Sequence, residues 1–165
     1  MARGPADAPV TIRWFADLTS PLHPQALAVL RQVVDAYPSD VRLVFRHAPL
    51  AARPEARLLH EAAVAGAEQG RFWELHDVLL QRPVADRERL ADYAAKLGLD
   101  RARFLDAIQS GRAAAAVDRD ITDGRALDVR GTPTFFVNDA RIDGVVTRDV
   151  LDQAITTALA QARAR

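Results

Sequence analysis

Two spacings of apolar residues alternate along this chain of 165 residues and predict a mixed α/β protein. Val10–Phe15 is rich in β-branched and aromatic residues and follows Pro9, which favours a largely buried strand. From Gln25 to Tyr37 apolar residues recur every three or four positions, as they do along the buried face of a helix. Val41–Arg46 alternates and predicts a second strand, parallel to the first because a helix connects the two.

Only helical patterns occur between about residues 51 and 128. The first of these helices is predicted at Pro54–Gln69, which carries its apolar residues on one side. Asp86 and Asp100 are predicted N-caps of later helices, because a carboxylate can accept hydrogen bonds from the free N–H groups of a first turn. Five consecutive helices between strands indicate an insertion into an α/β core rather than a series of βα units.

Strand patterns return near the end of the chain. Gly131–Val137 predicts a strand, a turn follows at Asn138, and Arg141–Gly144 is its predicted antiparallel partner. Thr147 is the predicted N-cap of a last helix with a regular apolar face. The whole pattern predicts one α/β domain over residues 1–165, interrupted by the all-helical insertion.

The amino-acid composition excludes several kinds of site and partner. It has no cysteine, which excludes disulfides, thiolate metal sites and a cysteine nucleophile. Acidic and basic residues balance at 22 each, so no net charge points to nucleic acid or to an anionic membrane. The first residues lack the apolar core of a signal peptide, and no apolar run is long enough to span a membrane. We therefore expect a cytoplasmic protein or a soluble domain of a larger membrane protein, without membrane insertion of this chain.

This order of elements, together with several short motifs, resembles the thioredoxin fold in its DsbA-like form. The motifs are Ala8-Pro9-Val10-Thr11, Phe45-Arg46-His47 with Pro49-Leu50, Gln69-Gly70-Arg71-Phe72-Trp73-Glu74-Leu75-His76-Asp77, and Gly131-Thr132-Pro133-Thr134-Phe135-Phe136-Val137-Asn138. The resemblance extends from about Gly4 to Leu159. Within the family, the chain is especially similar to the thioredoxin-like domains fused to some bacterial sodium/proton antiporters. It implies a thioredoxin-like α/β fold with a helical insertion.

The chain departs from this family at the motif that carries the chemistry. Catalytic members have Cys-Pro-X-Cys at the start of the first helix, whereas residues 20–23 here are Ser-Pro-Leu-His. Disulfide exchange requires a thiolate that attacks a disulfide sulfur, and neither an alcohol nor an imidazole can replace it. The resemblance therefore implies a site without oxidoreductase activity. It also implies that Pro133 is cis and lies against the first turn of that helix, where family members accept an extended peptide.

Ser20 and His23 stand at the two vacated cysteine positions, and each allows two interpretations. Ser20 is predicted to be an N-cap with Pro21 at the first helical position. Alternatively its hydroxyl donates to a bound thiolate or carboxylate, as implied by a resemblance to kappa-class glutathione transferases and chromene-carboxylate isomerases, which have Ser-Pro there. His23 is either a general base or ligand-facing donor, or a solvent-exposed polar replacement. The replacement is favoured because no nearby carboxylate orients the ring. Pro24 leaves the start of the helix open, since proline removes a backbone donor.

Of the other three histidines, His60 and His76 lie in the helical insertion without the spacing of metal ligands, and His47 ends a predicted strand. We interpret them as structural and expect no metal site.

Two hypotheses of function follow. The first is a redox-inactive DsbA-like domain that acts by binding or regulation, without a cofactor. Its partner, a protein, a peptide or a small thiol, would occupy a groove lined by Ser20, Pro21, Leu22, His23, Thr132 and Pro133. The second is a glutathione-dependent transferase or isomerase in which Ser20 stabilises the glutathione thiolate. The sequence alone identifies neither the partner nor the oligomeric state.

Overall fold

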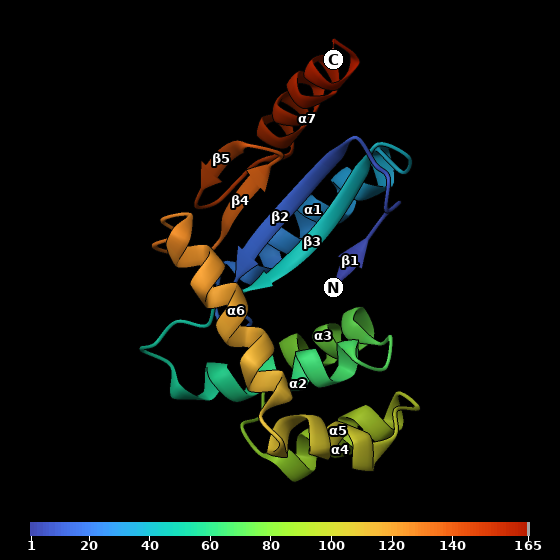
Figure 1. The fold of residues 1–165 in the computed structure, drawn as a ribbon, viewed down its shortest axis with the longest axis vertical. Coiled ribbons are helices and arrows are strands. Elements are labelled where there is room, and N and C mark those ends of the chain that lie inside the picture. The colour runs from blue at the N-terminus through green and yellow to red at the C-terminus, as the bar shows by residue number, and fades with distance from the viewer. Residues whose placement is uncertain (165) are drawn as a thin grey trace. The chain divides into compact units, whose positions relative to one another are not determined.

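The structure, a computed structural model, describes residues 1–164 and contains five strands and seven helices in that range (Figure 1). The strands are β1 Ala2–Arg3, β2 Val10–Ala16, β3 Val41–His47, β4 Thr134–Val137 and β5 Ala140–Asp143. The helices are α1 His23–Ala36, α2 Pro54–Ala67, α3 Phe72–Gln81, α4 Arg87–Lys96, α5 Arg101–Gln109, α6 Arg112–Ala126 and α7 Arg148–Arg163. The α/β order predicted from the sequence is confirmed.

The chain folds into two compact units. The sheet unit comprises Met1–Ala16, Ser20–Arg46 and Val129–Arg165. The helical unit comprises Asp17–Thr19 and His47–Asp128, and so contains the predicted helical insertion together with a short piece of the turn after β2. That the two units form one domain stays a prediction.

The sheet of the first unit has the strand order β1-β3-β2-β4-β5. Figure 1 shows β2 and β3 side by side and pointing the same way, with α1 behind them, which confirms the predicted parallel pair. The strand β4 runs antiparallel to β2 and to β5, as the hairpin pattern predicts. The strand β1 was not predicted: it pairs with β3 through two residues only, which is too short for an alternating pattern.

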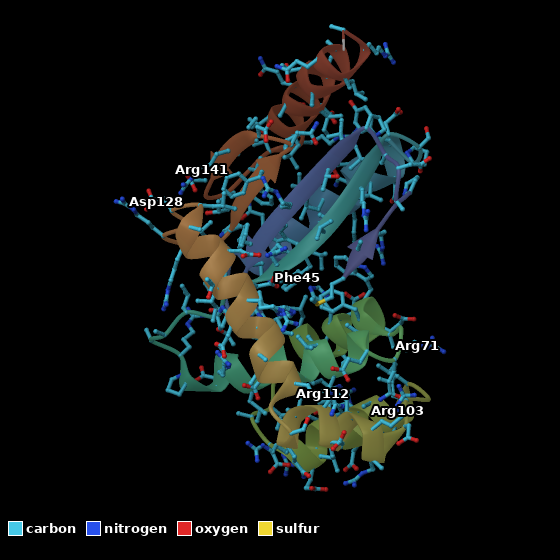
Figure 2. The ribbon with its side chains drawn as sticks, viewed as in Figure 1. Phe45, Arg71, Arg103, Arg112, Asp128 and Arg141 are labelled. Atoms are coloured by element: carbon cyan, nitrogen blue, oxygen red, sulfur yellow. The ribbon has the colours of Figure 1, made fainter. Side chains whose placement is uncertain are left out.

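Trp14 lies at the centre of the buried core of the sheet unit. Its ring centroid is 5.3 Å from that of Phe45 on β3, labelled in Figure 2, and 6.4 Å from that of Phe135 on β4. Alternate residues of β2, Val10, Ile12 and Trp14, are 0 % exposed. One face of this strand therefore packs entirely inside the unit, which agrees with the prediction of a largely buried strand.

The helical unit is organised around α2, which contacts α3, α5 and α6. A run of small residues makes these close contacts possible. At Gly66, a Cβ atom would lie 2.7 Å from the Leu75 Cδ2 atom of α3, so glycine sets the closeness of the two helices. Among residues 1–164, no helix combines the length and the apolar character that a membrane crossing requires.

Two aspartates cap helices of this unit, as predicted. Asp86 Oδ1 accepts a hydrogen bond of 2.9 Å from the Arg89 N–H, and Asp100 Oδ1 accepts one of 2.9 Å from the Arg103 N–H. Thr147 also occupies the predicted N-cap position, of α7, but without a side-chain hydrogen bond to the helix.

Asp86→Ala is expected to lower the free energy of unfolding by about 1 kcal/mol, because it leaves an N–H group of the first turn of α4 without its acceptor. Urea denaturation followed by circular dichroism measures the loss. Asp86→Asn is the matched control, since its amide oxygen can still accept this bond. Equal losses in the two variants would contradict the capping role.

Candidate functional site

Ser20–His23 forms a tight turn that precedes α1. The His23 N–H donates to the Ser20 carbonyl at 3.1 Å, and the Leu22 N–H donates to Ser20 Oγ at 3.3 Å. Pro21 takes the second position of this turn, where its fixed φ is favourable. The N-cap of α1 is Leu22, so the prediction that Ser20 caps the helix with Pro21 at its first position is wrong.

Pro24 explains where this helix begins. It is the second residue of α1, whose first residue is His23. A proline is tolerated there because the first N–H groups of a helix have no partner within it. The preceding turn presents exposed Pro21 and Leu22, the latter 37 % exposed, whereas Ser20 is only 8 % exposed. A ligand approaching this turn therefore meets apolar surface first.

His23 points into the sheet unit. Its side chain is 1 % exposed, and its ring centroid lies 4.5 Å from that of Trp14 and 6.0 Å from that of Phe45. The prediction of a solvent-exposed replacement is therefore wrong. The physical reason is its position on α1, because His23 continues the buried face that includes Ala26 and Leu30. The imidazole packs in an aromatic core and is poorly placed to act as a general base on a ligand in solvent.

The second predicted part of the site is the loop before β4. The Thr132–Pro133 peptide bond is cis, as the resemblance implies. The loop is tied to the end of the hairpin, since the Pro133 carbonyl accepts a hydrogen bond of 2.9 Å from the Gly144 N–H. Thr134 Oγ1 lies 2.9 Å from both the Gly131 carbonyl and Asp143 Oδ1. These contacts hold the loop in one conformation.

Thr132 is left with unused hydrogen-bonding capacity. Its Oγ1 atom is buried and has no partner within residues 1–164. The paired register of β4 with β2 and with β5 begins only at Thr134, so Thr132 lies outside both ladders. An extended chain could therefore pair with the backbone at this position, as in strand addition.

A hollow of about 400 Å³ lies beside this loop within the sheet unit. It is lined by Arg130, Gly131, Thr132, Pro133, Thr134, Arg141, Asp143 and Gly144. Arg141, labelled on the hairpin in Figure 2, places Nε 2.8 Å from Asp143 Oδ2. This hydrogen bond holds the pKa of Asp143 below its ordinary value, with a smaller contribution from Thr134. The rim of the hollow is thus polar and charged.

The strand register relates the two predicted parts of the site. Phe15, near the end of β2, lies opposite Thr134, the first residue of β4. Ser20 follows β2 in the chain and Pro133 precedes β4, so both belong to segments that leave the same end of the sheet. The hairpin was predicted, but Arg141 and Asp143 were not predicted to line the site. The two-residue turn after β4 places Arg141 opposite Phe136 and Asp143 opposite Thr134.

Two histidines of the helical unit share a buried hydrogen bond. The Nδ1 atoms of His47 and His60 are 2.7 Å apart, and His60 Nε2 accepts from the Leu18 N–H at 3.1 Å. Because His60 Nε2 accepts, the neutral ring carries its proton on Nδ1 and donates it to His47. His60 is thereby bonded at both nitrogens without a positive charge.

Asp17 sits next to this pair and is completely buried. It accepts hydrogen bonds from the Thr19 N–H at 2.9 Å, the Thr19 hydroxyl at 2.8 Å and the Leu50 N–H at 3.2 Å. Burial raises the pKa of Asp17, whereas nearby His60, whose Nε2 lies 3.5 Å from Asp17 Oδ1, and the hydrogen bonds from Thr19 outweigh burial and lower the pKa to about 2. On the other side of the pair, Asp120 Oδ2 accepts from the His47 N–H at 2.8 Å. These groups organise the turn after β2 from within the helical unit.

Comparison with known families and proteins covers most of the chain. Residues 51–156 match the profile of the DSBA-like thioredoxin domain. The chain is 42 % identical over 167 residues to Na(+)/H(+) antiporter NhaA 3 of Salinispora tropica, which covers 99 % of this chain and 25 % of that protein. It is 38 % identical over 165 residues to Na(+)/H(+) antiporter NhaA 1 of Salinispora arenicola, with coverages of 99 % and 25 %. The chain thus spans about a quarter of the length of these curated relatives.

Solved structures show the same arrangement of elements. A thioredoxin-like oxidoreductase from Silicibacter pomeroyi DSS-3 superposes with a TM-score of 0.84 at 28 % identity, covering 96 % of this chain and 91 % of that one. BdbD from Bacillus subtilis, in its oxidised form, superposes with a TM-score of 0.83 at 20 % identity and the same coverages. At that level of identity, the second similarity bears on the fold alone.

Proposed function

The chain belongs to the DSBA-like thioredoxin domain family, and we propose that it acts as a binding module of this family in which thiol–disulfide exchange has been lost. The observation that carries this proposal is the state of residues 20–23. An oxygen and a buried imidazole stand where exchange needs two sulfurs, while the cis-proline loop at Thr132–Pro133 is intact.

The surface left at this site suits a protein or peptide partner. Leu22 is one of the large apolar side chains exposed on the sheet unit, at the tip of the turn before α1. Thr132 lies two residues before the first paired residue of β4 and outside both strand ladders. An extended segment with an apolar side chain could bond to the loop and cover Leu22. If the bound segment belongs to a larger protein, its binding to this domain can regulate that protein.

The names of the curated relatives suggest which larger protein that is. Both are described as sodium/proton antiporters, and the chain matches a quarter of their length. We propose that the domain serves as an accessory binding domain of such a transporter, on the cytoplasmic side.

Purified protein is expected to show no insulin reduction above the buffer rate, because the chain has no thiol to start the exchange.

The binding surface is tested by NMR. With ¹⁵N-labelled protein and a reduced, carboxymethylated unfolded polypeptide as probe, amide shifts are expected at residues 20–23 and 131–134. Leu22→Gln is expected to weaken this binding.

Val150→Gln is the matched control for Leu22→Gln, since Val150 is also an exposed apolar residue of the sheet unit, 43 % exposed on α7. It should bind the probe as the unchanged protein does. Measurable insulin reduction would refute the loss of exchange chemistry. Shifts that avoid both segments, or equal losses in the two variants, would refute the binding surface.

One contact favours the glutathione-dependent transferase or isomerase as a second candidate. Ser20 Oγ accepts from the Leu22 N–H, so the hydroxyl proton is free to be donated to a bound thiolate. Calorimetry with reduced glutathione at millimolar concentration tests this candidate, and absence of heat removes it. If binding and turnover are found, Ser20→Ala should abolish turnover.

A further inference from the structure

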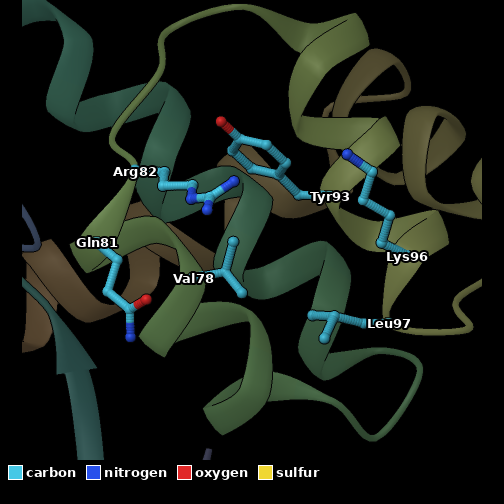
Figure 3. Close-up of a pocket in the computed structure, with 6 residues that line it drawn as sticks. All are labelled: Val78, Gln81, Arg82, Tyr93, Lys96 and Leu97. Carbon is cyan, nitrogen blue, oxygen red and sulfur yellow. The ribbon is translucent and has the colours of Figure 1, made fainter.

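A second hollow, of about 240 Å³, lies within the helical unit between the ends of α3 and α4 (Figure 3). It is lined by Val78, Gln81, Arg82, Tyr93, Lys96 and Leu97. None of these residues belongs to the site at Ser20 and Pro133. The hollow is smaller than the roughly 300–1,000 Å³ of sites for drug-sized ligands, which limits an occupant to a small molecule.

The charged side chains that line this hollow are both cationic. Arg82 and Lys96 are exposed and cationic, and no acidic residue is among the lining residues. Neither cation forms an ion pair within residues 1–164. Arg101, at the start of α5, provides a contrast, because it pairs with Glu88 and Asp92 of α4.

The end of α4 does not need these cations as a cap. Beyond α4, the Gly98 N–H donates to the Ala95 carbonyl at 2.9 Å and the Leu99 N–H donates to the Ala94 carbonyl at 3.1 Å. This pair of bonds is a Schellman motif, which satisfies the last carbonyls of the helix from the backbone. At the end of α3, the Arg82 N–H donates to the Val78 carbonyl at 2.9 Å. The side-chain charges therefore remain available to a ligand.

Three of the lining residues add apolar surface to this hollow. Val78, Tyr93 and Leu97 are half-buried. Figure 3 shows the side chains of Arg82 and Lys96 extending toward Tyr93 from either side. An occupant that satisfies this arrangement carries negative charge at one end and a short apolar body at the other.

We propose that this hollow binds a small organic carboxylate with an aliphatic or aromatic body. The guanidinium of Arg82 and the ammonium of Lys96 donate to the carboxylate, which gives charge-assisted hydrogen bonds. The apolar body lies on Tyr93 and Leu97 and loses contact with water. The site is independent of the proposed peptide-binding surface of the sheet unit.

The probe is 4-phenylbutyrate, titrated into ¹⁵N-labelled full-length chain at low salt. Amide shifts are expected at residues 78–82 and 93–97, with a Kd in roughly the millimolar range for a ligand of this size at an exposed site. Acetate tests the charge alone and 4-phenylbutyramide tests the apolar body alone. A dipeptide with a C-terminal phenylalanine tests whether a peptide carboxylate is also accepted. The affinity should fall as salt rises, because the cations are exposed.

Arg82→Gln and Lys96→Gln are each expected to weaken binding by roughly fivefold, the scale of an exposed ion pair, and the double variant should bind no better than the amide probe. Arg87→Gln is the matched control, because it removes an exposed arginine of α4 that does not line the hollow. Equal binding of acid and amide, shifts outside the hollow, or no shift at 10 mM 4-phenylbutyrate would each overturn the proposal.

Discussion

Trp14→Ala is expected to lower the free energy of unfolding by about 3–5 kcal/mol, the range for truncation of a large buried aromatic residue. Trp14 is 0 % exposed and is surrounded by rings from three other elements. These are His23 of α1, Phe45 of β3 and Phe135 of β4, all within 6.4 Å between centroids. The cavity left by the substitution would therefore face the helix and both neighbouring strands, and no single element could move to fill it.

Urea denaturation followed by far-ultraviolet circular dichroism measures this loss. Leu22→Ala is the control, because its side chain is 37 % exposed and should cost less than about 1 kcal/mol. If Trp14→Ala does not fold, Trp14→Phe keeps an aromatic ring and is expected to lose less. A loss below about 1 kcal/mol for Trp14→Ala would contradict the central place of this ring in the sheet unit.

The fold was predictable because each buried face follows one period. Val10, Ile12 and Trp14 are buried in strict alternation. An aspartate just before a helical pattern, as at Asp86 and Asp100, predicts an N-cap. Ser-Pro at residues 20–21 is different, because the same pair starts a helix or forms a turn. In both cases the serine oxygen accepts a nearby N–H, so the local pattern alone could not separate them.

The buried histidines differ in whether the sequence carried a signal for their surroundings. His23 stands three residues before Ala26 and seven before Leu30, so its burial on the α1 face could have been predicted from the helical period. The pair of His47 and His60 could not, because only tertiary packing within the helical unit brings these two side chains together. Resemblance to a family supplied the cis proline, which no periodicity indicates.

A further large effect is expected from acid, through His60 of the helical unit. Complete burial lowers the pKa of His60 below its ordinary value of 6.5, although nearby Asp17 acts in the opposite direction. The charges of His76 and Arg57 lower the pKa further. The Nδ1 atom of His47 also faces His60, at 2.7 Å from the His60 Nδ1 atom. His60 therefore stays neutral in the folded chain at pH values where it is protonated in the unfolded chain.

The sign of the pH dependence follows from proton linkage. Between the lowered folded pKa of His60 and about 6.5, the unfolded chain binds more protons, so stability increases with pH. The contribution is complete above about pH 6.5 and is lost as the pH falls through the folded pKa. Asp17 acts in a second window, because its pKa is lowered from 3.8 to about 2. Its contribution, of about 2 kcal/mol, is present above pH 3.8 and is lost toward pH 2.

The free energy of unfolding, measured in urea between pH 8 and pH 5, is expected to fall more steeply below pH 6.5 in the unchanged protein than in His60→Gln. Glutamine can still accept from the Leu18 N–H but cannot take up a proton in this range, so the difference in slope isolates His60 from the other histidines. Only the two slopes are compared, so a loss of stability that the substitution causes equally at every pH does not affect the result. Imidazole resonances followed by NMR give an independent readout, in which the His60 ring titrates below its ordinary pKa of 6.5. Parallel slopes, or a His60 ring that titrates at its ordinary pKa, would show that burial does not hold this histidine neutral.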